Sequence, residues 1–451
     1  MNLRKFILLG AVLALNFSLS AKDFNVLDYG AVGDGATLDT AAIQRTIDAA
    51  AGSGGRVVIP RGHTFLIATL VLKSDMDFHL AGELLISTNQ ADYATDGVIT
   101  ASNAPNLRIT GSGKISGRSL SFMTGYDAVG EWWLFKEWRP KMFLLTGCTN
   151  LTVRDITFGD APFWGLHMLG CKKVLIENVT VANRLDVPNC DGIDPDHCQD
   201  VEIRGCHIVA GDDAIVVKAT RQTQDFGPCA NIVVRDCVIE TQDSGVKIGT
   251  ETTADIHDIL FERCKIIRSS RGLTIQLRDE GNVYNIDFRD IKFVSRYHGD
   301  PWWGRGEAIS LTAIQRTNTT KLGTIHDVRI RNVSGRAENS VRICGSAASR
   351  IRNVLLENVS VKLDRWTPYK GGLFDNRPTK VMADIQEHGN PGIMISRADY
   401  VTLKNCRISW GRNRPNYFTY ALEAEGVAGL QLTDFVGEAA HPERDEAVVV
   451  K

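Results

Sequence analysis

A strand-forming phrase that recurs along the chain is the feature that most restricts the possible fold. Nine copies, each alternating hydrophobic with other residues around a central Asn, Asp or Arg in most copies, begin at residues 150, 173, 200, 231, 258, 285, 327, 353 and 400. Successive starts are 23, 27, 31, 27, 27, 42, 26 and 47 residues apart. Such a period, built from β-branched strands without helical periodicity, is typical of a parallel β-helix. We therefore predict an all-β, single-domain solenoid, with the long steps marking loop insertions.

The residues before the repeats predict a signal peptide and a capping helix. Arg4 and Lys5, an apolar run over 6–15 and small residues before Ala21 are typical of a secretory signal over 1–20. No cysteine that could carry a lipid precedes Cys148, so we expect a secreted or periplasmic protein whose residues 21–451 form the β-helix domain. An apolar stripe over 40–51, followed by glycines, predicts one helix that closes the N-terminal end of the solenoid core.

The charge balance excludes partners that need a strongly basic surface. The formal net charge is −2, and removal of Arg4 and Lys5 makes it −4. Because no global basic field would attract a polyanion, any positive patch must be local. We expect no nucleic-acid partner, no membrane partner and a monomer.

Eight of the ten cysteines fall into two columns of the repeat. Disulfides or a zinc site are conceivable for such columns, but free cysteine is among the most buried residue types. We therefore predict that the columns stack as small apolar residues inside the solenoid. The columns are Cys206, Cys237, Cys264 and Cys406, and Cys148, Cys171, Cys198 and Cys229.

Two carboxylate clusters, NCDGID at 189–194 and GDD at 211–213, mark the candidate site. The repeat places them at equivalent positions in neighbouring turns, so Asp191, Asp212 and Asp213 should converge. Glycosidic hydrolysis needs one protonated carboxyl to donate to the leaving oxygen and one carboxylate to activate water. Repulsion among three close carboxylates keeps one of them protonated near neutral pH. These residues predict an enzyme that acts on a polysaccharide.

Alignment of successive turns places further side chains beside the clusters. Neighbouring turns are about 4.8 Å apart, so aligned residues form columns along the solenoid. The predicted columns are Asp191, Asp213, Ser244 and Arg271; Asp194, Val216, Lys247 and Thr274; and Asp212 with Asp243. Acidic groups at one end and the cations at the other favour an acidic sugar chain, whose carboxylates the cations would hold in a wet cleft.

Over nearly the whole mature chain, these motifs resemble glycoside hydrolase family 28, the polygalacturonase-like enzymes. Asn189 and Asp191 match the family's N-x-D motif, and Asp212 and Asp213 match its D-D pair. The resemblance implies a right-handed parallel β-helix and an inverting reaction without metal or cofactor. It also implies that Asp212 is the general acid, with Asp191 and Asp213 positioning and deprotonating water.

Two motifs of that family are missing, which predicts a rebuilt substrate-binding region. Ser244 stands where the family has the histidine of G-H-G, and Thr274 and Gln276 stand where it has the cations of R-I-K. We expect relocated cations and two loop tryptophans to bind substrate instead, with Asn189 and Ser244 also lining the site. The candidate cations and tryptophans are Lys247, Arg271, Arg278, Trp302 and Trp303.

The sequence therefore predicts a hydrolase of acidic, galacturonate-containing plant polysaccharide. Long insertions at 284–326 and 352–399 favour exo-action, because loops beside a solenoid groove can leave a pocket that accepts only a chain end. Two alternatives stay open. One is a polysaccharide lyase on the same scaffold, with Ca²⁺ bound by the carboxylates, and the other is a non-catalytic carbohydrate-binding protein.

Overall fold

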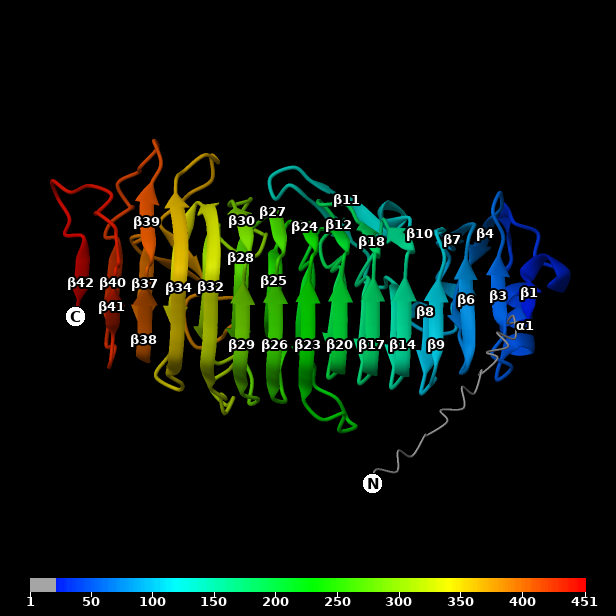
Figure 1. The fold of residues 1–451 in the computed structure, drawn as a ribbon. Coiled ribbons are helices and arrows are strands. Elements are labelled where there is room, and N and C mark those ends of the chain that lie inside the picture. The colour runs from blue at the N-terminus through cyan, green and yellow to red at the C-terminus, as the bar shows by residue number, and fades with distance from the viewer. Residues whose placement is uncertain (1–21) are drawn as a thin grey trace, which may run out of the picture.

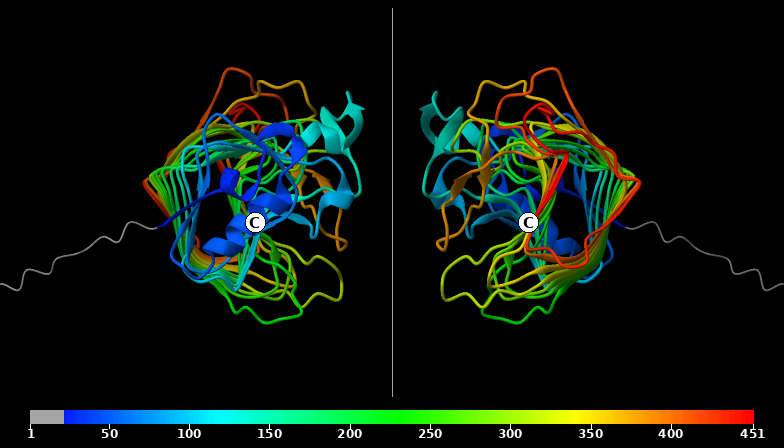
Figure 2. Two further views of the ribbon diagram at one scale, coloured as in Figure 1. Left: turned by 90° about the vertical axis from the view of Figure 1, so that its right-hand side faces the viewer. Right: turned by 90° about the vertical axis from the view of Figure 1, so that its left-hand side faces the viewer.

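The protein is an elongated coil of parallel strands, which confirms the predicted all-β solenoid (Figure 1). The computed structural model describes residues 22–451, and the predicted signal peptide lies outside them. Successive turns stack along one axis, and the end-on views show a closed cross-section (Figure 2). The described chain runs from the α1 end of the coil to β42 at the other end, so neighbouring turns are close in sequence.

Thirteen strands form the sheet that carries the candidate site, and they pair in parallel from turn to turn. They are β5 (Leu70–Val71), β8 (Gly97–Ser102), β13 (Lys141–Thr146), β16 (Leu166–Leu169), β19 (Ile193–Asp196), β22 (Ile215–Ala219), β25 (Ser244–Thr252), β28 (Arg271–Leu277), β31 (Glu307–Ala313), β33 (Asn339–Cys344), β37 (Ile393–Ser396), β40 (Leu422–Glu425) and β42 (Val448–Val450).

The remaining faces of the coil form a 25-stranded sheet, whose two rows of strands join where β32 and β34 run continuously through both. Its strands are β1 (Asp23–Asn25), β2 (Asp34–Leu38), β3 (Arg56–Ile59), β4 (Thr64–Ile67), β6 (Met76–Leu80), β7 (Glu83–Ile86), β9 (Leu107–Thr110), β10 (Lys114–Ser116), β14 (Thr149–Arg154), β15 (Thr157–Gly159), β17 (Lys172–Glu177), β18 (Thr180–Ala182), β20 (Gln199–Arg204), β21 (His207–Ala210), β23 (Cys229–Arg235), β24 (Val238–Thr241), β26 (Ile256–Glu262), β27 (Lys265–Ser269), β29 (Val283–Arg289), β30 (Lys292–Ser295), β32 (Ile325–Ala337), β34 (Ile351–Leu363), β38 (Ala398–Lys404), β39 (Arg407–Trp410) and β41 (Gln431–Thr433).

The repeated phrase folds in this way because of its first residue and its alternation. All nine copies begin on a residue with φ between 53° and 59°, and seven of the nine are Asn or Asp, the exceptions being Lys173 and Tyr400. Asn and Asp tolerate this left-handed conformation better than most residues, so they bend the chain at each corner. Their side chains also bond between turns, as where Asn231 donates to Asp200 at 3.1 Å. The apolar positions then stack inside, as Val201, Ile232 and Ile259 do.

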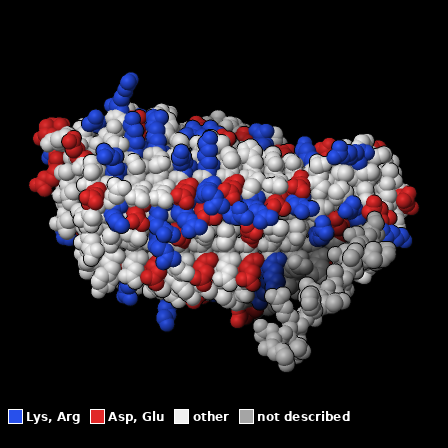
Figure 3. Space-filling model, in the orientation of Figure 1, with Lys and Arg blue, Asp and Glu red and all other residues white. Residues whose placement is uncertain are grey.

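Ion pairs between turns cover the outer face of the strands seen in Figure 3, where positive and negative side chains alternate. Arg235, for example, pairs with Glu202 of the preceding turn, and Arg289 pairs with Glu262. Such exposed pairs contribute little stability individually. Because the two signs alternate, this face carries no patch of a single sign.

The N-terminal end of the core is closed by α1 (Thr40–Ala50), which confirms the predicted capping helix one residue shorter than expected. Ile43 and Ile47 of α1 are fully buried against the first turns. Short 3₁₀ segments are η1 (Val26–Tyr29), η2 (Gln90–Asp92) and η3 (Ser119–Phe122). No helix among the described residues is long and apolar enough to cross a membrane.

All ten cysteines are free and buried, which confirms the predicted cysteine columns. The eight cysteines of the two columns belong to the main hydrophobic core. Each thiol of the Cys206 column lies near a backbone carbonyl, as in the contact of Cys237 with Arg235 at 3.3 Å.

Two antiparallel hairpins interrupt the coil and lie beside the candidate site. The first pairs β11 (Met123–Asp127) with β12 (Trp132–Phe135), and the second pairs β35 (Leu373–Asp375) with β36 (Ile385–Glu387). The second belongs to the predicted insertion over 352–399, whereas the first interrupts the chain before the first repeated phrase.

Candidate active site

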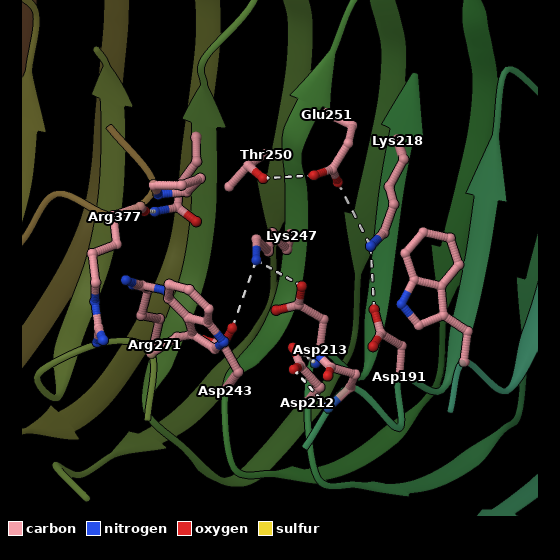
Figure 4. Close-up of a pocket in the computed structure, with 15 residues that line it drawn as sticks. Asp191, Asp212, Asp213, Lys218, Asp243, Lys247, Thr250, Glu251, Arg271 and Arg377 are labelled. Atoms are coloured by element: carbon pink, nitrogen blue, oxygen red, sulfur yellow. Dashed lines mark hydrogen bonds and ion pairs between the residues drawn. The ribbon is translucent and has the colours of Figure 1, made fainter. Parts of the chain in front are cut away.

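A cavity of about 210 Å³ opens on the outer face of β22, β25 and β28, and charged side chains form most of its wall (Figure 4). Strands supply one side, the turns before them supply the carboxylates, and two insertions supply the remaining side. The lining residues are Trp164, Asn189, Asp191, Asp212, Asp213, Lys218, Asp243, Lys247, Thr250, Glu251, Arg271, Gln276, Trp303, Arg377 and Pro378.

The three predicted carboxylates converge at this cavity. Asp191 lies just before β19, and Asp212 and Asp213 lie just before β22, so the turn-to-turn register brings them together. Each offers an oxygen within 4.8 Å of an oxygen of the other two. They are 2%, 6% and 2% exposed, respectively, so little water is available to screen their repulsion.

The strand register matches the predicted columns. Ser244 pairs with Arg271, and Lys247 pairs with Val216 on one side and with Thr274 on the other. The prediction of which side chains share a column is therefore confirmed.

Two of the three candidate catalytic carboxyls each lie against a buried lysine, and the third does not. The Nζ of Lys247 lies 2.6 Å from Asp213 and 3.6 Å from Asp243. The Nζ of Lys218 lies 3.2 Å from Asp191. Among the described residues, no Lys, Arg or His nitrogen lies within 4.0 Å of an Asp212 oxygen. Asp212 is thus the carboxyl of the three with no cation against it.

Electrostatics therefore favour a proton on Asp212. Burial, and then the charges of Asp191, Asp213 and Asp243, raise the pKa of Asp212 well above its usual range. Its oxygens accept the backbone N–H groups of Asn189 at 3.1 Å and of Asp213 at 2.9 Å. These two bonds favour the ionised form but do not outweigh burial and repulsion.

For Asp213 and the two lysines, the effect of burial on the pKa is opposed by neighbouring charges of opposite sign. Burial raises the pKa of Asp213 to about 7, although Lys247 opposes the shift. Burial alone would lower the pKa of Lys247, but Asp213 and Asp243 outweigh it and the pKa is raised. The pKa of Lys218 is raised in the same way, because Asp191 and Asp194 outweigh its burial. Both lysines therefore stay charged beside the carboxylates.

Asn189 positions the acid candidate. Its backbone adopts a φ of 60°, which turns its N–H toward Asp212, and its side-chain oxygen accepts a 2.9 Å bond from Arg139. Arg139 also donates to the carbonyls of Pro162 and Pro188 at 3.0 Å, so it fastens the turn that carries the N-x-D motif.

Three of the predicted substrate-binding residues do not reach the cavity. Ser244 is fully buried and donates to Asp243 at 3.1 Å. Arg278 is fully buried and bonds to Thr312 at 3.1 Å, because the strand carries it beyond the cavity. Trp302 is 1% exposed and packs edge-on against Trp132 at 5.6 Å, so its faces are unavailable for sugar stacking.

The expectation of a wet cleft around the two relocated cations is also wrong. Lys247 and Arg271 both line the cavity, but they are only 6% and 1% exposed. Arg271 lies 3.1 Å from Asp243 and 3.0 Å from Asp375. Because both carboxylates are buried too, Arg271 contributes to the structure of the wall as well as to its charge.

Sequence reasoning missed Lys218 and Arg377. Lys218 had a usable signal, because it follows Val216 by two positions and strand alternation places it on the same outer face. It also pairs in register with Asp196 of the previous turn. Arg377 had no such signal, because it lies in an irregular insertion whose path only the folded chain defines.

The two insertions meet at Asp375 to form one wall of the cavity. The Asp375 carboxylate lies 3.0 Å from Arg271 and 2.8 Å from Arg377, and it accepts the N–H of Gly304 at 2.7 Å. The Arg377 guanidinium lies 4.7 Å above the ring of Trp303, the one predicted tryptophan that lines the cavity.

The opposite wall contains Trp164, whose place the sequence left open. The ammonium groups of Lys141 and Lys218 lie 4.2 and 4.1 Å from its ring centroid. The Nε2–H of His167 beneath it donates to Asp196 at 3.1 Å, so the ring stands on a buried polar network.

Comparison with known proteins agrees with the fold. The family described as "Glycosyl hydrolases family 28" matches residues 53–368, well over half of the chain. The chain belongs to glycosyl hydrolase family 28. The fold is accordingly the right-handed parallel β-helix that the resemblance implied.

The individual relatives have low sequence identity to the chain. The chain is 26% identical over 294 residues to a "Probable polygalacturonase" of Vitis vinifera, covering 57% of this chain and 58% of that protein. It is 26% identical over 360 residues to an "Exopolygalacturonase" of Zea mays, covering 75% and 83%. The Yersinia enterocolitica family 28 exopolygalacturonase superposes with a TM-score of 0.69 at 21% identity, covering 92% and 78%.

Proposed function

We propose that the protein hydrolyses galacturonate-containing pectic polysaccharide, with Asp212 as general acid. The observation that carries this proposal is the convergence of three buried carboxyls of which only Asp212 lacks a lysine within 4.0 Å among the described residues. Membership of family 28 and the names of the polygalacturonase relatives support the reaction and substrate class.

The geometry supports a balanced division of roles. Asp212 donates its proton to the glycosidic oxygen as the bond to the anomeric carbon breaks. Water held by Asp191 and Asp213 attacks that carbon and gives its proton to one of them. Asp212 is then ionised and the base protonated, and proton exchange with solvent restores the starting state. Lys218 lies 3.2 Å from Asp191 and Lys247 lies 2.6 Å from Asp213, so each water-binding carboxyl has a positive partner.

We propose inversion of the anomeric configuration. The closest carboxylate oxygens lie within 4.8 Å, nearer than the roughly 6.5–9.5 Å between the carboxyl groups of most inverting enzymes, so distance does not carry this part. The lysine contacts do support it, because a carboxylate bound to an ammonium is a weaker nucleophile for a covalent intermediate. NMR of the first product tests it, and a retained anomer contradicts it.

The wall built by the insertions favours exo-action. Arg377 and Trp303 close one side of the cavity, and Tyr369 of the same insertion donates a 2.6 Å bond to Glu131 of the β11–β12 turn. A chain that must enter a closed cavity presents its end, so early products should be one short unit and viscosity should fall slowly. A rapid fall in viscosity with mixed oligomers would instead indicate an open groove.

The positive side chains of the wall suit a uronate. Lys247, Arg271 and Arg377 line the same cavity as the three carboxyls, and charge-assisted bonds are the strongest way to hold a substrate carboxylate. The cell compartment is part of the proposal: a secreted or periplasmic enzyme would meet polymeric substrate, and fractionation of producing cells tests it.

Product analysis on polygalacturonate, rhamnogalacturonan and neutral pectic chains is the deciding experiment. Reducing ends without ultraviolet-absorbing unsaturated sugars support hydrolysis. The lyase alternative is favoured by one observation, namely that the three carboxylates could together hold a cation. Unsaturated products would establish that alternative, and binding without products would establish a non-catalytic carbohydrate-binding protein.

A further inference from the structure

A second, larger cavity of about 480 Å³ lies further along the same sheet, beside β33 and β37. It shares no lining residue with the catalytic cavity. The segment 375–378 separates them, since Arg377 and Pro378 line the first and Phe374 lines the second. Its volume is in the range of about 300–1,000 Å³ that small-molecule sites occupy.

Arg342 of β33 is a buried cation in the wall of this cavity. It is 3% exposed, and its guanidinium lies 4.6 Å from the ring centroid of Phe374. It donates to the carbonyl of Asp375 at 3.2 Å and to the side-chain oxygen of Asn376 at 2.6 Å. Its Nε has no hydrogen-bond partner.

A second buried guanidinium stands behind it. Arg278 donates to the carbonyl of Asn376 at 3.2 Å, so Asn376 lies between the two arginines. Throughout residues 22–451, no carboxylate oxygen lies within 4.0 Å of either guanidinium. Burial, and then repulsion from Arg342, lowers the pKa of Arg278 to about 9, although the charge of Asp375 opposes the shift.

Two buried cations with no carboxylate in direct contact are costly, and a bound anion would reduce that cost. The rest of the wall has one further cation, Arg397, and one carboxylate, Glu425. It also has hydroxyl and amide groups from Ser346, Ser396 and Gln386, and apolar groups from Met382 and Met394. Such a mixture suits a ring with several hydroxyls and a C–H face.

We propose that this cavity binds the carboxylate of an acidic monosaccharide, at a site separate from the catalytic cavity. Arg342 supplies the charge, and the polar wall receives the hydroxyls. The need for an anion follows from the two arginines alone, whereas the choice of a sugar acid rests on the proposed function.

Calorimetric titration of the Asp212→Asn protein with galacturonic acid tests the proposal. We expect two molecules to bind per chain, one in each cavity, and galactose to bind far more weakly at the second. Arg342→Met should lower the affinity of the second site roughly tenfold to a hundredfold, as expected for loss of a charge-assisted bond. Two sites of unchanged affinity in the Arg342→Met protein would overturn the proposal.

A second variant guards against misfolding of the first. Ala348 is exposed and lines the mouth, so Ala348→Trp should block the cavity without disturbing the core. Ala36→Trp, at an exposed alanine near the N-terminus, is the matched control and should keep both sites. Two bound molecules in the Ala348→Trp protein would overturn the proposal.

The two proposals fail in different ways. One result would be a protein that binds galacturonate in an Arg342-dependent way and yet hydrolyses no uronate polymer. That result would support the second site and refute the catalytic proposal. Normal hydrolysis with a single bound galacturonate, insensitive to Arg342→Met, would sink only the second site. Acetate binding there as tightly as galacturonate would overturn the assignment to a sugar.

Discussion

Asp212→Asn should abolish most activity and also change how stability depends on pH. The substitution keeps the size of the side chain but removes the proton that the acid donates. Proton transfer of this kind contributes about 10²–10⁴-fold to rate, and we expect kcat on polymer to fall by that range.

The stability effect follows from the raised pKa of Asp212. A carboxyl with a folded-state pKa above its unfolded value of about 3.9 stabilises the fold fully below that value, and the contribution is lost as pH rises through the folded pKa. The wild type should therefore lose up to about 1.4 kcal/mol per pH unit relative to the variant above pH ~4, until Asp212 is ionised.

The new amide adds a constant cost that does not hide this trend. Both Asp212 oxygens accept backbone N–H groups, so one of these donors would face the NH₂ of the asparagine. That loss amounts to roughly 1–3 kcal/mol but is the same at every pH. The informative quantity is therefore the change in the stability difference with pH, not its value at one pH.

Urea unfolding of both proteins at steps between pH 4 and pH 7 measures that change. Asp243→Asn is the matched control, because Asp243 is buried in the same cluster, but Lys247 and Arg271 outweigh its burial and lower its pKa. The stability that Asp243 contributes is present above pH ~3.9 and is lost only below it. Its variant should therefore change less between pH 4 and 7 than Asp212→Asn does, and only through the loss of the Asp243 charge that raises the pKa of Asp212 and of Asp213. Parallel curves for wild type and Asp212→Asn would refute the assignment of a protonated Asp212.

Three further predictions follow from the same cluster. Lys247→Met should raise the pKa of Asp213, because the Lys247 charge lowers it, and so move the acidic limb of the kcat/KM profile to higher pH. The control Lys265→Met, at an exposed site, should leave that limb unchanged. An unmoved limb for Lys247→Met would contradict the base role of Asp213. Arg271→Met should cost about 3–5 kcal/mol of unfolding free energy, because it leaves two buried carboxylates short of a partner, and a cost below 1 kcal/mol in urea unfolding would show that they find other partners. Chelator-treated enzyme should keep its rate, and activity that Ca²⁺ restores would favour the lyase.

The sequence by itself determined the coil, the register and the carboxylate triad. A turn of a parallel solenoid pairs only with its neighbours, so spacing along the chain converts directly into position in space. This is why the spacing of the repeats alone brings Asp191, Asp212 and Asp213 together and places Lys247 in the column of Val216.

Tertiary structure alone decided everything that the insertions contribute. The wall at Asp375 joins Arg271 of β28 to Arg377 of a loop about a hundred residues later, and no repeat fixes the path of that loop. The sequence also did not determine which loop side chains are buried. Trp302 and Trp303 are adjacent, yet Trp302 is buried by packing and Trp303 lines the cavity. Local pattern fixes a position only where neighbours in space are also neighbours in the repeat; elsewhere packing between distant segments selects the residues that meet.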